Sequence, residues 1–224
     1  MNSTAEIQRP RDDERDLFGL THVGKVRQEN QDHFLICTVY RQVVIDVTSL
    51  PNADQLELRG PRLATIGLVA DGVGGSDGGS DASRLAAETI TRYVASTLRS
   101  YHAAGSANED VLMKSLTDAV LQAHDVVRAE SATRADPRPM ATTLTLCMGV
   151  WPWMYVVQVG DSRCYYFDGN RLIQVTRDQT IAQHLVDTGA LPKERLASSP
   201  FKHVLASAIG GEEALPQVSR IDLR

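Results

Sequence analysis

The sequence contains few cysteines and no long apolar run. Its 224 residues include three cysteines, Cys37, Cys147 and Cys164, and none belongs to a CxxC pair. An odd number of cysteines without that spacing argues against a disulfide framework and against a zinc site. We therefore expect buried free thiols in a reducing compartment. No stretch of 18 apolar residues occurs, so we expect no membrane span.

Positive charge is also in short supply. Lysine and arginine number 23 against 28 acidic residues, which gives a formal net charge of −5. Nucleic-acid-binding surfaces usually carry a basic stripe, so we expect no nucleic-acid partner. The polar first residues lack the apolar centre of a signal peptide. We expect a flexible N-terminal leader over residues 1–17, one domain over residues 18–224, and a cytoplasmic location.

The remaining pattern indicates strands in blocks, separated by helices. Helical apolar spacing predicts one helix that starts from Asp81, a second over residues 109–132, and a third that Thr180 caps and Gly189 ends. Residues 49–61 are typical of a surface excursion. Strand patterns occur at residues 33–39, 43–47, 64–70, 142–148, 154–159, 164–167 and 172–175. Because strands do not alternate one for one with helices, the order favours an α+β fold with antiparallel sheets covered by helices.

Asp71 ends the buried strand pattern of residues 64–70 and is followed by the glycine-rich residues 72–75. Hard divalent cations bind carboxylate and carbonyl oxygens. Gly72 would let its own carbonyl turn toward an ion. A plain flexible turn before a helix is the alternative. A phosphate-binding P-loop is a second alternative, but the Gly-Lys-Ser or Gly-Lys-Thr that a P-loop requires does not follow.

Two other polar segments could contribute to the same site. Arg27 and Asp32 lie just before the strand pattern of residues 33–39. Asp32 could supply a second metal ligand, and the planar guanidinium of Arg27 suits phosphate oxygens. Residues 159–163, with the sequence VGDSR, form a tight polar turn between two apolar strands. Taken alone, the first segment is more simply a solvated turn and the second a hairpin with an exposed arginine.

Taken together, these segments resemble the protein phosphatase 2C (PPM) family of bacterial type, from about residue 20 to residue 211. Six motifs carry the resemblance in order: GxxRxxNQD at 24–32, VADGVGG at 69–75, ATTL at 141–144, VGDSR at 159–163, TRDQT at 176–180 and LASAIGG at 205–211. The resemblance implies a sandwich of two antiparallel β-sheets flanked by helices, with a centre of two Mn²⁺ or Mg²⁺ ions at one end.

The resemblance also implies roles for individual residues. Asp71 would bridge the two metal ions, Asp32 and the Gly72 carbonyl would complete one of them, and Arg27 would hold the substrate phosphate. Asp161 matches a position that in bacterial members can help to bind a third, weaker ion. A metal-activated water would then hydrolyse phosphoserine or phosphothreonine on proteins that bacterial Ser/Thr kinases have phosphorylated.

Two of the chain's departures from the family pattern bear on catalysis. Val73 stands where some members carry a histidine, a candidate proton donor to the leaving oxygen. Members also continue to a Ser-Asp-Gly segment and a final Asp-Asn pair, and this sequence ends at Arg224 before either. We therefore expect missing C-terminal strands, poor binding of one metal and slow turnover. The alternatives are a catalytically impaired pseudophosphatase that serves as a binding or regulatory module, and a phosphatase of small metabolites.

Overall fold

The computed structural model describes residues 8–42, 59–73, 77–103, 109–135 and 140–224. Its larger sheet has six antiparallel strands, in the order β1-β2-β4-β5-β8, with β3 paired to β2. These strands are β1 (Asp32–Gln42), β2 (Arg59–Val73), β3 (Ala141–Thr142), β4 (Leu144–Val150), β5 (Trp153–Val159) and β8 (Gln217–Asp222). A smaller antiparallel sheet pairs β6 (Tyr165–Phe167) with β7 (Leu172–Gln174).

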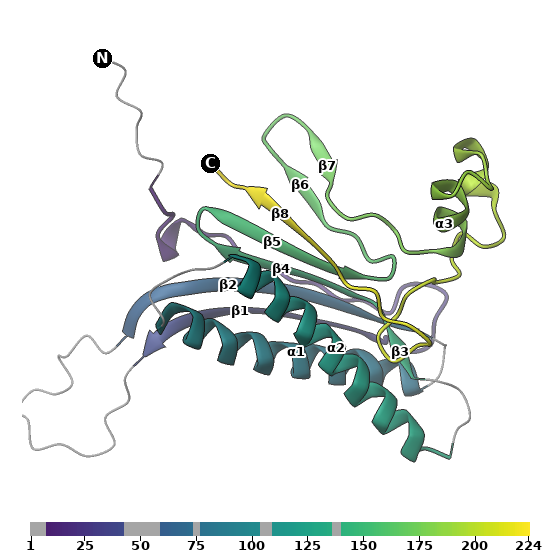
Figure 1. Cartoon of the computed structure of the whole chain (residues 1–224), viewed down its shortest axis with the longest axis horizontal. Helices are drawn as coiled ribbons and strands as arrows, with labels where there is room; N and C mark the ends of the chain where they lie inside the picture. The colour runs from purple at the N-terminus through teal and green to yellow at the C-terminus, as the bar shows by residue number, and fades with distance from the viewer. Residues whose placement is uncertain (1–7, 43–58, 74–76, 104–108, 136–139) are drawn as a thin grey trace, which may run out of the picture.

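Two long helices, α1 (Asp77–Ala103) and α2 (Glu109–Thr133), pack against each other and against one face of the larger sheet. Figure 1 shows the β6–β7 hairpin projecting away from that sheet, and α3 (Ile181–Asp187) near one end of the molecule. A 3₁₀ helix, η3 (Lys193–Ser198), packs against α3. The predicted α+β class, with two antiparallel sheets flanked by helices, is confirmed.

The core lies between the larger sheet and the two long helices. Alternate residues of each strand point toward the helices, as a period of two requires, and the predicted stripe of α2 packs against them. Fully buried members include Ile66, Leu68, Leu144, Leu146, Ile90, Leu116 and Val120. Burying such a side chain contributes about 1.5–3 kcal/mol, so this layer fixes the strand order on which the site depends.

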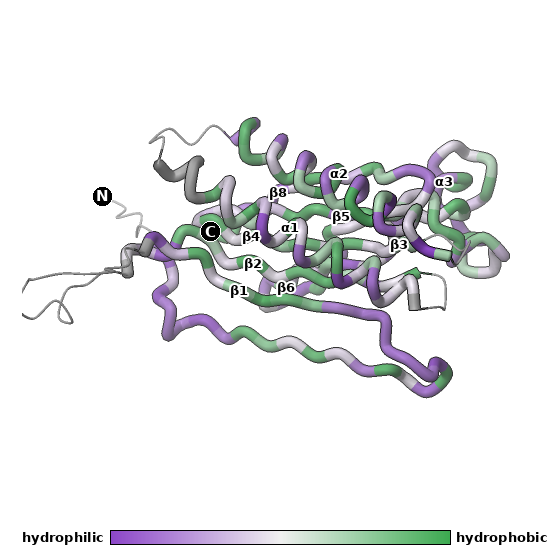
Figure 2. Tube along the Cα trace, turned by 90° about the horizontal axis from the view of Figure 1, so that it is seen from below, coloured by the Kyte–Doolittle hydropathy of each residue, from purple (hydrophilic) through white to green (hydrophobic). Residues whose placement is uncertain are grey.

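The opposite face of the larger sheet is covered in part by residues that precede β1. Arg15, after the short 3₁₀ helix η1 (Asp12–Glu14), donates hydrogen bonds to Thr38 of β1 and Thr65 of β2 at 3.4 and 2.5 Å. In Figure 2 this preceding segment runs alongside β1. Arg15, within the expected leader, therefore contacts the domain, and the domain boundary at residue 17 stays a prediction.

Several boundaries differ from those expected. Helix α1 begins at Asp77 and not at a cap on Asp81, because Gly78 and Gly79 are buried against the sheet and packing outweighs their low helix propensity. The Asp81 carboxylate instead accepts a hydrogen bond from Arg134 at 2.6 Å. Residues 59–61 belong to β2 and not to a surface excursion. The strand expected over residues 43–47 lies outside the described residues.

Other local expectations hold. Thr180 caps α3 by accepting a hydrogen bond from the Gln183 amide at 3.2 Å. Gly189, just after that helix, has φ = +77°, the left-handed conformation that glycine adopts readily. The three cysteines are free thiols, but each is half-buried and not buried as expected. Among the described residues, no helix has both the length and the apolar character needed to cross a bilayer.

Candidate metal centre

The aspartates Asp32 and Asp71 are direct cross-strand partners. Asp32 is the first residue of β1, Asp71 lies near the end of β2, and the antiparallel register sets the two opposite each other. Side chains at directly opposite positions point to the same face, with Cβ atoms about 4.5–5.5 Å apart. The sheet therefore brings together two carboxylates that are far apart in the sequence, and both residues are exposed to solvent.

The charge of Asp71 is strongly affected by its surroundings. Partial burial of the carboxyl group, then the charge of Asp32 and a hydrogen bond between the two carboxyl groups, raise the pKa of Asp71 to about 6. Asp161 adds a smaller contribution in the same direction, and Arg27 acts in the opposite direction. Three charged residues therefore act electrostatically on Asp71, namely Asp32, Asp161 and Arg27. The two negative charges outnumber the one positive charge.

The backbone of Asp71 is fixed by two threonines. Its amide donates to the Thr143 hydroxyl at 3.2 Å, and its carbonyl accepts from the Thr143 amide and the Thr142 hydroxyl, both at 2.9 Å. Both threonine side chains are buried. The ATTL motif of residues 141–144 marked this segment in the sequence without indicating its role, which is to hold the Asp71 backbone in place.

Gly72 is required by close packing and not by an unusual backbone angle. A Cβ atom at this position would lie 2.4 Å from the carbonyl oxygen of Gly79 and 2.9 Å from that of Gln31. The Gly72 amide also donates to the Gln31 carbonyl at 3.2 Å. The first turn of α1 thus rests directly on the strand end that carries Asp71. Gly74 and Gly75 lie outside the described residues.

Asp161 occupies the turn that follows β5. Gly160, which precedes it, has φ = +93°, and a Cβ atom there would lie 2.7 Å from the Thr143 methyl group. The Gly160 amide donates to the Gln179 side chain at 2.8 Å, and the Gln179 amide donates to the Gly160 carbonyl at 3.0 Å. Thr143 therefore contacts both the Asp71 strand and the Asp161 turn. Partial burial, then the charge of Asp178, raises the pKa of Asp161.

Arg27 lies in an exposed turn before β1. Nearby, the Asn30 side chain accepts a hydrogen bond from the Asp32 amide at 3.1 Å and donates to Thr21 at 2.6 Å. Arg163, the exposed arginine of the VGDSR turn, forms a two-pronged ion pair with Asp178, at 2.8 and 2.6 Å. The positive charge of Arg27 therefore acts on Asp71, whereas Arg163, in the turn that contains Asp161, is paired with Asp178.

The arrangement is a carboxylate pair with a third carboxylate further away. No group of three or more His, Cys, Asp or Glu side chains placed to hold a metal ion occurs among the described residues. The structure pairs Asp32 with Asp71, with Gly72 next in the chain, and it places Arg27 and Asp161 near enough to affect the pKa of Asp71. The roles of all five residues stay predictions. Sequence reasoning missed Thr143 and Gln179 as supporting residues, because their hydrogen bonds depend on contacts between distant segments.

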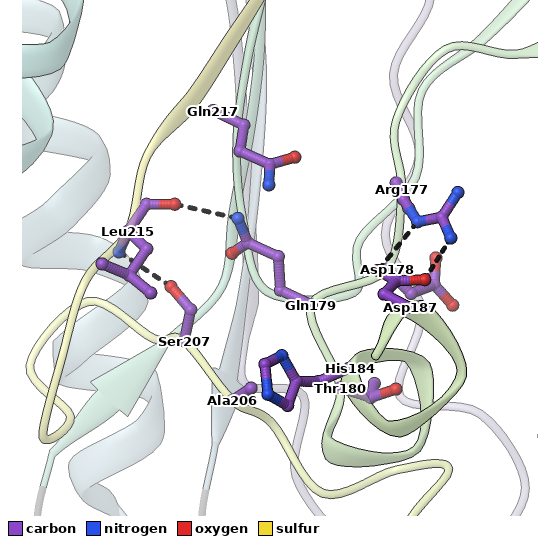
Figure 3. Close-up of a pocket in the computed structure, with 10 residues that line it drawn as sticks. All are labelled: Arg177, Asp178, Gln179, Thr180, His184, Asp187, Ala206, Ser207, Leu215 and Gln217. Atoms are coloured by element: carbon purple, nitrogen blue, oxygen red, sulfur yellow. Dashed lines mark hydrogen bonds and ion pairs between the residues drawn. The ribbon is translucent and has the colours of Figure 1, made fainter. Parts of the chain in front are cut away.

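A separate hollow lies beside α3, with a volume of about 150 Å³. Figure 3 shows it lined by the residues that follow β7, by α3 and by the segment before β8. Within it Arg177 forms an ion pair with Asp187, and the Gln179 side chain donates to the Leu215 carbonyl at 2.8 Å. Asp178 pairs with Arg163, which lies outside the hollow. It contains neither Asp32 nor Asp71.

The fold and the paired strand-end aspartates define a helix-covered antiparallel β-sheet protein with a candidate cation site. Residues 46–201 match the family model described as protein phosphatase 2C. The chain is 29% identical over 161 residues to the serine/threonine protein phosphatase PstP of Mycobacterium tuberculosis, which covers 72% of this chain and 29% of PstP. It is 33% identical over 147 residues to the serine/threonine phosphatase stp of Listeria welshimeri, covering 66% of this chain and 56% of that protein.

Solved structures of bacterial serine/threonine phosphatases have a similar fold. The catalytic domain of the serine/threonine phosphatase PstP in complex with two manganese ions superimposes with a TM-score of 0.55 at 24% identity, covering 86% of this chain and 73% of that one. The chain belongs to the protein phosphatase 2C family, as its motifs predict. It spans between about a third and just over half of the length of the two curated relatives.

Proposed function

We propose that this chain hydrolyses phosphoserine and phosphothreonine esters on proteins, with a divalent cation held by Asp32 and Asp71. The observation that carries this proposal is the cross-strand pairing of these two carboxylates at one end of the larger sheet. Like charges directly opposite each other destabilise a sheet unless something compensates them. A bound cation would supply that compensation.

The donor set fits a hard divalent cation. Asp32 and Asp71 offer carboxylate oxygens, the Gly72 carbonyl lies next in the chain, and both aspartate residues are exposed to solvent as whole residues. Mg²⁺ and Mn²⁺ prefer oxygen ligands of this kind and keep several waters. Burial contributes most to the raised pKa of Asp71, and the charge of Asp32 comes next. A bound cation would offset that second contribution. We infer that Asp161 contributes from the neighbouring turn, toward a weaker additional ion.

When bound, such ions acidify a coordinated water and neutralise charge on phosphoryl oxygens. The chain's own residues orient the substrate. Arg27 presents five N–H donors in a planar fork that matches two phosphate oxygens, and its exposure leaves it accessible to a phosphorylated side chain. Thr142 and Thr143 keep the Asp71 backbone in position through buried hydroxyl groups.

The substrate class rests on the relatives. Both curated relatives are named serine/threonine phosphatases, and the PstP structure contains two manganese ions. We infer phosphorylated proteins as substrates, made by bacterial Ser/Thr kinases, and two Mn²⁺ or Mg²⁺ ions as cofactors. The donor set favours neither Mn²⁺ nor Mg²⁺ over the other, because both ions accept carboxylate and carbonyl oxygens.

Titration calorimetry with Mn²⁺ tests the cation site directly. We expect the wild-type chain to bind Mn²⁺ and Asp71→Asn to bind it at least about tenfold more weakly, because loss of even an outer-shell partner of a metal ligand typically costs about 10–100-fold in affinity. Asp125→Asn, an exposed aspartate on α2, is the matched control and should bind as the wild type does. Equal binding by all three chains would exclude Asp71 as a ligand.

Hydrolysis assays then test the reaction and its substrate. We expect Mn²⁺-dependent release of phosphate from a phosphothreonine peptide, with a lower rate for Asp71→Asn and for Arg27→Ala. Equal turnover of free phosphoserine and of the peptide would instead indicate a phosphatase of small metabolites. Metal-independent hydrolysis would contradict the mechanism.

A second candidate function is a binding or regulatory module without efficient catalysis. It is favoured by the absence, among the described residues, of a third acidic or histidine ligand close to the Asp32–Asp71 pair. Such a module would bind a phosphopeptide with the same affinity in the presence of Mn²⁺ or of a chelator and would release no phosphate. Calorimetry with the peptide under both conditions separates the two functions.

A further inference from the structure

Two of the three thiols lie in contact on the face of the larger sheet away from the long helices. The sulfur atoms of Cys147 and Cys164 are 3.4 Å apart. Cys147 is in β4, where its neighbours Leu146 and Met148 are buried in the core, so strand alternation directs Cys147 to the opposite face. Cys164 directly precedes β6 and approaches this face from the smaller sheet. Both residues are half-buried and thus partly open to solvent.

Cys164 has the environment of a reactive thiol. The Cys147 thiol, which can donate a hydrogen bond to the Cys164 sulfur, lowers the pKa of Cys164 to about 7 against a smaller opposing effect of burial. The same hydrogen bond, and then burial, raises the pKa of Cys147. Because thiolates are the nucleophilic form, Cys164 is the one to react first. Cys37 lies on the helix side of the sheet, packed against the core, and burial raises its pKa.

Cys164 belongs to the same turn as Asp161. Between them, the Ser162 carbonyl accepts from the Thr145 hydroxyl at 2.7 Å, and the Ser162 hydroxyl bonds with that of Thr143 at 2.6 Å. Thr143 is also the residue that holds the Asp71 backbone. A disulfide needs its sulfur atoms about 2.05 Å apart. Closing the 3.4 Å gap would therefore shift Cys164 or β4 and strain the hydrogen bonds that link this turn to the strand end of Asp71.

We propose that Cys147 and Cys164 form a peroxide-sensitive thiol pair, whose closure to a disulfide shifts the Asp161 turn and lowers metal-dependent hydrolysis. The first half of this proposal, disulfide formation, is independent of the chain's function. The second half rests on the phosphatase function proposed above. The oxidant is hydrogen peroxide or another hydroperoxide.

The chemistry balances in two steps. The Cys164 thiolate attacks one peroxide oxygen, the O–O bond breaks, and Cys164 becomes a sulfenic acid while hydroxide leaves and takes up a proton to form water. The Cys147 sulfur then attacks the Cys164 sulfur, the S–O bond breaks, and the Cys147 proton leaves with the hydroxyl group as a second water. In total, two thiols and one peroxide give one disulfide and two waters.

Thiol counting and peptide mapping of the full chain test the first half. After brief treatment with hydrogen peroxide, we expect the three titratable thiols of the reduced chain to fall to one. The intact mass should fall by two hydrogens, and the proteolytic map should show a Cys147–Cys164 linkage that a dithiol removes. Cys37→Ser should form the same linkage. Cys147→Ser should instead accumulate a sulfenic acid on Cys164, detectable with dimedone.

Retention of three thiols, or oxidation of Cys37 ahead of Cys164, would overturn the proposed thiol chemistry. The second half is measured by Mn²⁺-dependent hydrolysis of p-nitrophenyl phosphate. We expect oxidised wild type to lose activity several-fold and to regain it with a dithiol, while Cys164→Ser is insensitive to peroxide. A disulfide that leaves hydrolysis unchanged would overturn the coupling to the Asp161 turn. A reduced chain without hydrolysis would contradict the proposed function, while the mass measurement still decides the disulfide.

Discussion

Asp71 ionises less readily than an ordinary aspartate, and this property makes stability depend on pH in a specific direction. Its pKa in the folded chain is raised to about 6 from 3.8. The favourable contribution of the protonated group is therefore complete below about pH 4 and is lost as the pH rises through 6. In metal-free protein, Asp71→Asn should raise Tm at pH 7.5 and leave it nearly unchanged at pH 4.

The size of this effect is limited by solvent, because Asp71 is exposed. We expect about 1 kcal/mol, or roughly 2–4 °C in Tm for a chain of this length. Thermal unfolding with a chelator present, followed by circular dichroism at both pH values, measures the difference. Asp125→Asn, remote on α2, should show no such pH-dependent gain. A stabilisation of Asp71→Asn at pH 4 as large as at pH 7.5 would mean that repulsion between ionised carboxylates is not its cause.

At Gly72, beside the candidate metal ligands, even a methyl side chain should destabilise the fold. The Cβ of Gly72→Ala would meet the backbone carbonyl of Gly79 at 2.4 Å, and backbone cannot rotate away as a side chain can. We expect destabilisation by about 1–3 kcal/mol. Gly67→Ala in the same strand, where an added Cβ meets nothing within 4 Å, should change stability by less than about 0.5 kcal/mol. Urea unfolding compares them, and equal effects would contradict the packing argument.

At the scale of elements, the segment around η1 is joined to β1 and β2 by a network centred on Asp12. Its carboxylate accepts from Arg62 at 2.6 Å, from the Tyr40 hydroxyl at 2.5 Å and from Arg15 at 3.1 Å. The Arg62 side chain is only 9% exposed. Asp12→Ala would thus leave a largely buried guanidinium with less compensation, and we expect a loss of about 2 kcal/mol in unfolding free energy.

Asp13→Ala is the matched control for this network. Asp13 pairs with Arg11 at 3.2 Å, but both side chains are more than 70% exposed. Exposed pairs contribute at most about 1 kcal/mol and often nothing measurable. Chemical unfolding of the two variants should therefore separate them clearly. Similar midpoints for both would show that the segment before β1 does not support the sheet.

Local signals in the sequence predict some elements better than others. Helix α2 shows a regular apolar stripe, and α3 has the Thr180 cap and Gly189 stop, so both follow from short-range chemistry. The start of α1 did not follow, because buried glycines there are helical only through contacts with the sheet. Strand β8 escaped prediction because its exposed, mixed polar residues are selected by pairing with β5, a distant partner.

At the scale of the whole molecule, the candidate site depends on strand pairing. The sequence motifs single out Asp32 and Asp71, but only the β1–β2 register makes them direct neighbours. A slip of one residue would send the two carboxylates to opposite faces. The supporting contacts of Thr143 with Asp71 and Ser162 join three separate segments. No single stretch of sequence contains the information for such a junction, which is why these residues were not predicted.

The anchoring of the segment before β1 has a practical consequence for protein engineering. Shortening a chain to its apparent domain is a common step before crystallisation or tagging. Removal of residues 1–17 would delete Asp12 and Arg15, and with them the polar contacts to Arg62, Tyr40, Thr38 and Thr65. These contacts lie on the two strands whose ends carry the acidic pair. A trimmed protein would therefore be a poor reference for activity, and affinity tags are better joined ahead of residue 8 than in place of this segment.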